Sequence, residues 1–160
     1  MRYLSLVMGA IWIGGLGLIG GVAGQAVFDV LTAHDSVSGR VLAGEVFGVV
    51  LVRTIHVLMA AGVIQLLLVG IRAALGPRPR RFKAQVAILL LMLGLTGYVG
   101  YIVAPRIDAI RQSRPNTPIA SLAADDPVRR EFVMLHGLSN GLLLVAWIGA
   151  LTLTWFERRE

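Results

Sequence analysis

Four long stretches of this chain contain no Asp, Glu, Lys or Arg, and they constrain its fold more than any other feature. They cover residues 3–28, 54–71, 84–105 and 132–156. A helix needs about 20 residues to cross the hydrocarbon core of a bilayer. Because each stretch reaches or approaches that length, the sequence predicts four transmembrane helices.

The composition excludes the main alternatives. Hydrophobic residues make up 56% of the 160 residues and charged residues only 15%, whereas a soluble domain carries about 25% charged residues. A soluble enzyme and a disordered chain are therefore excluded. The apolar runs show no alternation of polar and apolar residues, so a β-barrel is not expected. Cysteine is absent, which excludes disulfides, iron–sulfur clusters and thiolate zinc sites.

The expected fold is all-α, an integral membrane four-helix bundle in a single transmembrane domain. The domain covers residues 1–160, the first connection lies around residues 33–45, and the spans lie at about residues 3–30, 46–75, 84–108 and 130–156. No motif completes a catalytic constellation, so we do not expect an enzyme.

The charges between the spans predict the orientation. The connection at residues 72–83 is short and carries Arg and Lys but no acid, and such loops face the cytoplasm. Both termini would then be cytoplasmic, in a multi-pass protein of the bacterial inner (plasma) membrane. The arginines of the connection at residues 106–131 are the main evidence against this orientation. In that connection, Asp126 followed by Pro127 predicts a helix start.

The net charge of +6 comes from clusters between apolar runs. This distribution is typical of the flanks of membrane spans and does not indicate nucleic-acid binding. The expected partners are the lipid bilayer and either a membrane-protein partner or further copies of the chain.

Glycines are concentrated in the first and third spans. Small residues four apart let transmembrane helices pack closely, and a substrate groove lined by these glycines is the alternative interpretation. The glycines expected at helix contacts are Gly14, Gly17, Gly20, Gly21, Gly24, Gly94 and Gly97.

A candidate polar intramembrane site comprises Arg53, His56, His136, Ser139 and Asn140. Arg53 either extends to the headgroup level or faces inward, where it would pair with a carboxylate or hold an anionic ligand. We expect His136 to face the bundle interior and to hydrogen-bond a group from another helix. The alternative to a functional site is a structural hydrogen-bonded cluster.

The two intramembrane histidines suggest one cofactor. His56 and His136 lie toward the same side of the membrane in the expected topology, so they could ligate a b-type haem, with Arg53 near a propionate. The leading expectation remains that the chain has no cofactor and no metal site.

Four segments of the sequence carry a resemblance to a known family. They are Trp12-Ile-Gly-Gly with Phe28, the stretch from Ser38 to Phe47, Val103-Ala-Pro-Arg-Ile-Asp, and Phe132-Val-Met-Leu-His-Gly-Leu-Ser. In this order they resemble the transmembrane protein 205-like family, whose bacterial members are a domain of unknown function.

The resemblance implies a four-span integral membrane protein with no assigned enzymatic activity or cofactor, and it supplies no mechanism. This chain departs from some relatives because no His precedes Trp12 in the first span. It also has Phe47-Gly48 where they have Phe-Pro.

Three functions follow from these observations. The first is a structural or accessory subunit of a larger membrane assembly. The second is a small-molecule or metal transport or tolerance protein that uses the polar intramembrane residues. The third is a haem redox protein that uses His56 and His136.

Overall fold

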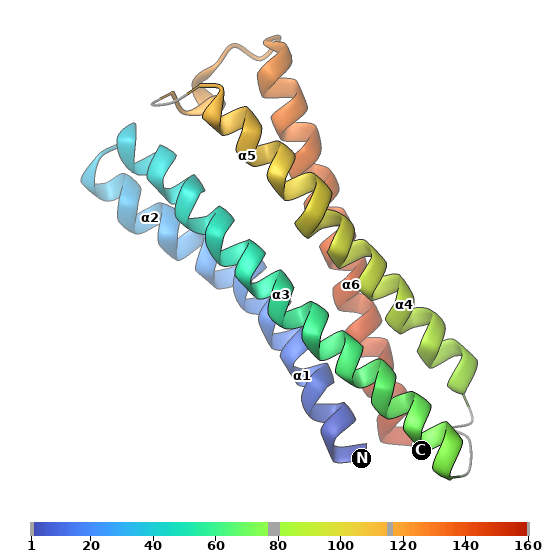
Figure 1. Ribbon diagram of the computed structural model, residues 1–160. Coiled ribbons are helices and arrows are strands. Elements are labelled where there is room, and N and C mark those ends of the chain that lie inside the picture. The colour runs from blue at the N-terminus through green and yellow to red at the C-terminus, as the bar shows by residue number, and fades with distance from the viewer. Residues whose placement is uncertain (1, 77–80, 115–116, 160) are drawn as a thin grey trace.

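The structure, a computed structural model, describes residues 2–76, 81–114 and 117–159, and their secondary structure is entirely helical. Four long helical segments run side by side (Figure 1), and each is long and apolar enough to cross a membrane. The all-α four-helix prediction is confirmed. The elements are α1 (Arg2–Leu18), η1 (Ile19–Ala23), α2 (Gly24–His34), α3 (Ser38–Leu75), α4 (Phe82–Tyr98), η2 (Val99–Val103), α5 (Ala104–Gln112), η3 (Ile119–Ser121) and α6 (Pro127–Arg159).

The first connection is shorter than the sequence predicted. α3 begins at Ser38, whereas the predicted span begins at about residue 46, so the helix starts within the predicted connection. The Oδ1 atom of Asp35 accepts hydrogen bonds from the backbone N–H groups of Val37 and Ser38, at 2.7 and 2.8 Å. These bonds satisfy free donors at the helix start, and they hold the pKa of Asp35 below its usual value.

The start of α6 agrees with the sequence. The backbone N–H of Val128 donates to Asp126 Oδ1 at 2.8 Å, and Pro127 is the first residue of the helix. The basic connection between α3 and α4 is described only in part, because residues 77–80 lie outside the described residues. Both termini lie at the end of the bundle where this connection is found (Figure 1).

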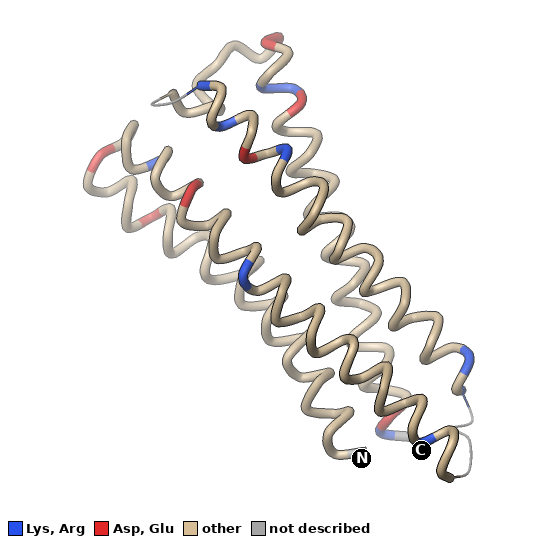
Figure 2. The backbone as a smooth tube through the Cα atoms, viewed as in Figure 1, with Lys and Arg blue, Asp and Glu red and all other residues tan. Residues whose placement is uncertain are grey.

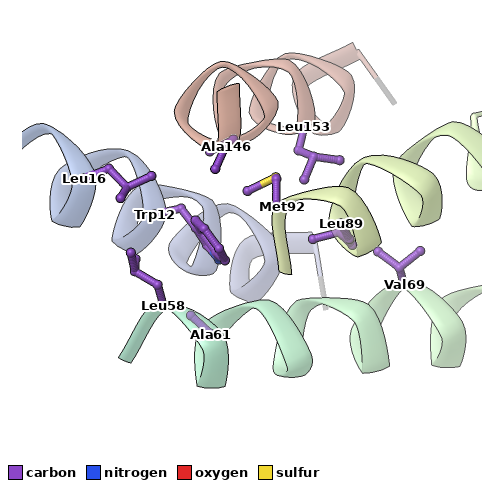
Figure 3. Close-up of a cluster of buried hydrophobic side chains, with 10 residues drawn as sticks. Trp12, Leu16, Leu58, Ala61, Val69, Leu89, Met92, Ala146 and Leu153 are labelled. Atoms are coloured by element: carbon purple, nitrogen blue, oxygen red, sulfur yellow. The ribbon is translucent and has the colours of Figure 1, made fainter. Parts of the chain in front are cut away.

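One end of the bundle is closely packed, and we call it the closed end. Here α1, α3, α4 and α6 surround a core centred on Trp12, which is fully buried (Figure 3). The other buried members of this core are Leu16, Leu58, Ala61, Val69, Leu89, Met92, Ala146, Ala150 and Leu153. Large apolar side chains interdigitate with alanines, so these four segments approach closely.

A buried ion pair also joins two helices at the closed end. Arg72 near the end of α3 donates to both carboxylate oxygens of Glu157 in α6, at 2.8 Å each. The Glu157 side chain is 3% exposed. Figure 2 shows Lys and Arg together with Asp and Glu at this end of the bundle, near the marked termini.

The opposite end is divided into two arms, and we call it the open end. α2 packs on α3 to form one arm, and α5 packs on α6 to form the other. The second arm has a small core of its own, in which Val103 and Ile107 pack against Leu135. Figure 1 shows the two arms diverging from the closed end.

Two π-helical segments lie where the arms begin. η1 begins three residues after Leu16, the member of the closed core in α1 nearest the open end. η2 contains Gly100, which lies closely against Ile55 of α3. π-helical turns inside α-helices change the helix direction. Pro105 follows η2 and has no N–H for a backbone bond, a further cause of local deviation. The bundle therefore opens where two of its four segments depart from regular α-helix.

Candidate functional site

A cavity of about 1280 Å³ lies between the two arms. Small-molecule pockets usually measure about 300–1,000 Å³, so this one is large. Its walls come from both arms, and its base lies where the closed core begins. We call this space the cleft.

The base of the cleft is apolar. Leu16 and Gly17 of α1 line it together with Leu143 and Trp147 of α6. The indole Nε1 of Trp147 donates to the backbone oxygen of Ile13 at 3.2 Å. This bond fixes the ring across α1 and α6, and the ring contributes a large apolar surface to the cleft.

All five residues of the predicted polar site line this one cleft. They are Arg53 and His56 from α3, and His136, Ser139 and Asn140 from α6. The sequence identified these residues separately, and the fold brings the two helices to opposite walls. Their role in binding stays a prediction.

The depth of the polar residues can be counted from the Arg72–Glu157 ion pair. Arg53 lies 19 residues from Arg72, and His136 lies 21 residues from Glu157. At 1.5 Å per residue these separations are about 28 and 31 Å. The two side chains therefore leave their helices at nearly the same level, about one hydrocarbon thickness from the closed end.

His136 is half-buried and packs against its own helix. Its ring centroid lies 4.5 Å from that of Phe132. Its Nδ1 atom is buried and has no hydrogen-bond partner in the described part of the chain. The expected hydrogen bond to another helix is therefore not made at Nδ1, although the ring does face the cleft.

Arg53 and His56 are exposed toward the cleft. The His56 ring contacts Tyr101 of η2, with centroids 5.9 Å apart. Within the described residues no ion pair joins Arg53 to a carboxylate. The sequence left open that an inward-facing Arg53 pairs with a carboxylate, and this pairing is not found among the described residues.

Arg111 of α5 is a site residue that the sequence reasoning missed. Its guanidinium lies 5.6 Å from the Phe132 ring centroid, on the arm formed by α5 and α6. Its NH1 group reaches the other arm and donates to the backbone oxygen of Gly44 at 2.7 Å. Arg111 therefore bridges the two arms across the cleft.

Two glycines of α3 make room for this bridge. A Cβ atom at Gly44 would lie 3.4 Å from the Arg111 guanidinium, and one at Gly48 would lie 3.1 Å from it. The signal available in the sequence was this pair of glycines one turn apart, at the start of the predicted second span.

The structure corrects part of the predicted glycine packing. A Cβ atom at Gly14, Gly20, Gly21 or Gly94 would meet no described atom within 4 Å, so these are not close helix contacts within the chain. Gly17, Gly20 and Gly21 line the cleft instead, because η1 lies where the arms separate. That this groove holds a substrate stays a prediction.

The other two predicted contact glycines do pack against neighbours. A Cβ atom at Gly24 would lie 3.2 Å from Phe47, and one at Gly97 would lie 3.6 Å from Met59. Other glycines make tighter contacts in the closed half. At Gly62 a Cβ atom would lie 2.7 Å from Leu93, and at Gly149 it would lie 2.9 Å from Met92.

The described residues contain no group of three or more His, Asp and Glu side chains placed to hold a metal ion. Both histidines of the haem hypothesis line the cleft, but each ring already packs on an aromatic neighbour. The geometry therefore offers polar donors beside an apolar surface, a combination suited to an amphipathic molecule.

Comparison with known families gives one match. The profile described as "Domain of unknown function (DUF4149)" matches residues 7–116. The chain belongs to this family. No curated protein and no solved structure gives a significant match. The matched region includes Arg53, His56 and Arg111, whereas all of α6, with His136, lies outside it.

Proposed function

We propose that this protein is a non-enzymatic, multi-pass protein of the bacterial inner membrane that binds a small amphipathic molecule in the cleft. The observation that carries the proposal is the cleft itself, with an apolar base at Trp147 and polar groups above it. We also propose that both termini are cytoplasmic, which the basic connection at residues 72–83 supports. Kinship to the transmembrane protein 205-like family is part of the same proposal, and the four segments that resemble that family support it.

The position of the cleft in the membrane supports this function. Trp147 lies 10 residues from Glu157, which is about 15 Å along α6 and near the middle of the hydrocarbon core. Asn140 lies 17 residues from Glu157, about 26 Å along the same helix. The polarity of the cleft therefore changes with depth as the polarity of a single-chain amphiphile changes along its length.

Filling the cleft tests this function. Gly20→Leu combined with Gly21→Leu adds bulk where the structure has open space beside the cleft. Gly94→Leu is the matched control, because Gly94 also has open space but does not line the cleft. The measurement is native mass spectrometry of the purified proteins in dodecyl phosphate, which counts bound amphiphiles.

We expect the wild type and Gly94→Leu to retain a bound amphiphile and the double variant to lose it. Equal occupancy in all three proteins would contradict the proposal. The same samples test the haem alternative. If the wild type shows a Soret absorption band and both His56→Ala and His136→Ala lack it, the ligand of the cleft is haem and not an amphiphile.

An accessory subunit is the second candidate function. It is favoured by the open space at Gly20 and Gly21, because a helix of a partner could approach a glycine surface closely. Light scattering of the protein in detergent separates the two candidates. A defined heteromeric or homomeric assembly that the double leucine variant disrupts would favour the subunit, and an unchanged monomer would favour amphiphile binding.

A further inference from the structure

The cleft carries an uneven distribution of charge. Its described lining includes the four arginines Arg40, Arg53, Arg111 and Arg114, against the two carboxylates of Glu45 and Asp108. The positive excess suggests an anionic occupant. The position of each charged residue along its helix further supports an anionic occupant.

The two carboxylates lie nearer the open end than Arg53 does. Glu45 precedes Arg53 by eight residues on α3, which is about 12 Å. On the other arm, Tyr101 marks the Arg53 level because it contacts His56. Asp108 lies seven residues beyond Tyr101, which is about 10 Å along the helix. No described carboxylate of the cleft therefore lies at the depth of Arg53.

The groups that do lie at the depth of Arg53 can donate hydrogen bonds. His136, Ser139 and Asn140 face the same cleft from α6. A hydroxyl, an amide and an imidazole each supply a donor to an anion. Arg53 supplies a full positive charge, which is costly near hydrocarbon unless an opposite charge is close.

A second cation lies above this level on the other arm. The Arg111 guanidinium lies beside Phe132, whose ring also contacts His136. The hydrogen bond to Gly44 uses one N–H of the guanidinium, which has five N–H donors in all. Arg111 is thus a second positive group at the entrance to the Arg53 level.

We infer that the occupant is an amphiphile with an anionic head group, bound by Arg53 together with Ser139 and Asn140, with its alkyl chain against Trp147. The inference rests on the proposed function, because it names the ligand class of the same cleft. Arg111 lies farther out, at the level of Gly44, and adds positive charge at the entrance of the cleft. A carboxylate or phosphate at the end of one alkyl chain satisfies this geometry.

The test compares dodecyl phosphate, dodecylphosphocholine and dodecyltrimethylammonium, which share one chain and differ in head charge. Binding to the protein in nanodiscs is measured by native mass spectrometry for the wild type and for Arg53→Gln. Arg130→Gln is the matched control, because Arg130 is an exposed arginine of α6 that does not line the cleft. Inorganic phosphate is added as a competitor in a separate arm.

We expect dodecyl phosphate to bind at least about tenfold more tightly than the other two amphiphiles. Arg53→Gln should remove this preference, since loss of one charge-assisted hydrogen bond has about that effect. Arg130→Gln should keep it, and inorganic phosphate should compete weakly because it lacks the chain. Arg111→Lys keeps the charge without the planar fork, so it should retain part of the preference.

The outcomes separate this inference from the proposed function. Equal binding of the three amphiphiles, still lost in the Gly20→Leu, Gly21→Leu variant, would overturn the anionic preference and leave amphiphile binding standing. A preference that survives Arg53→Gln unchanged would overturn the assignment of the head-group site. The absence of binding by any of the three amphiphiles would overturn both the inference and the proposed function.

Discussion

The closed and open ends belong to the same four membrane-length helical segments, yet only the closed end fills its interior. At the closed end Trp12, Leu58 and Met92 occupy the space between four helical segments, and they are almost completely buried. At the open end the two arms pack internally and leave the cleft between them. Hydrophobicity therefore places all four helices in the membrane, while side-chain size and helix geometry decide where they touch.

The largest expected difference between the ends concerns their ion pairs. Glu157→Ala leaves Arg72 without its buried carboxylate at the closed end, and removal of one partner of a buried pair costs about 3–5 kcal/mol. Glu131→Ala removes the partner of Arg106 at the open end, where the arginine side chain is 67% exposed. Such surface pairs contribute about 0–1 kcal/mol.

Thermal unfolding of both variants in the same detergent measures this difference. Glu157→Gln is a useful control, because it retains the side-chain volume and changes the charge. Equal shifts of the unfolding midpoint in Glu157→Ala and Glu131→Ala would contradict the contrast between the ends.

The second contrast concerns glycines. Gly62→Ala places a methyl group 2.7 Å from Leu93 and 3.1 Å from Trp12 in the closed core, and such overpacking costs about 1–3 kcal/mol. At Gly17, beside the cleft, the nearest atom would be Trp147 Nε1 at 3.9 Å. Gly17→Ala should be neutral or stabilising by about 0.5–1 kcal/mol, because alanine favours the helix.

Unfolding midpoints of the two alanine variants test this contrast. A loss of stability in Gly17→Ala as large as that in Gly62→Ala would mean that the cleft is closed in the membrane. The leucine substitutions at Gly20 and Gly21 should likewise reduce amphiphile binding without the loss of stability expected at Gly62.

The smallest effect is expected at His136. His136→Ala removes the ring that packs on Phe132, and an aromatic pair contributes about 0.5–1.5 kcal/mol. His136→Phe keeps the ring contact and removes a buried Nδ1 that has no described partner, so it should be tolerated. An unfolding midpoint for His136→Phe below that of His136→Ala would show that a polar contact of the imidazole matters.

The fold was largely predictable from the sequence because uncharged runs of this length have few alternatives to helices. The start of α3 was missed because residues 38–45 contain Arg40 and Glu45, and charge was taken as the end of the helix. In fact the helix extends for 38 residues, about 57 Å, well beyond the hydrocarbon core.

The site was predictable only residue by residue. Arg53 and His136 were identifiable because ionisable groups are rare in membrane spans. Arg111 was not, because it lies in a region with several charges, and its bridge to Gly44 depends on how two arms are placed. The open face of η1 was also hidden, since a glycine stripe looks the same whether a helix packs on it or a cleft adjoins it.

The three tryptophans provide the most direct test of the central claim that one end is closed and the other forms a binding cleft. Trp12 is fully buried in the closed core, Trp147 lines the cleft, and Trp155 is 51% exposed on the bundle surface. Three variants, each retaining one of these tryptophans and carrying phenylalanine at the other two positions, are titrated in nanodiscs with a dodecyl phosphate brominated on its chain. Fluorescence quenching by bromine reports contact with each ring.

The account predicts saturable quenching of Trp147, no quenching of Trp12, and quenching of Trp155 that rises without saturation as the amphiphile enters the bilayer. Prior addition of unbrominated dodecyl phosphate should protect Trp147 alone. Quenching of Trp147 that is absent, or that follows the unsaturated course of Trp155, would contradict a binding cleft between the arms.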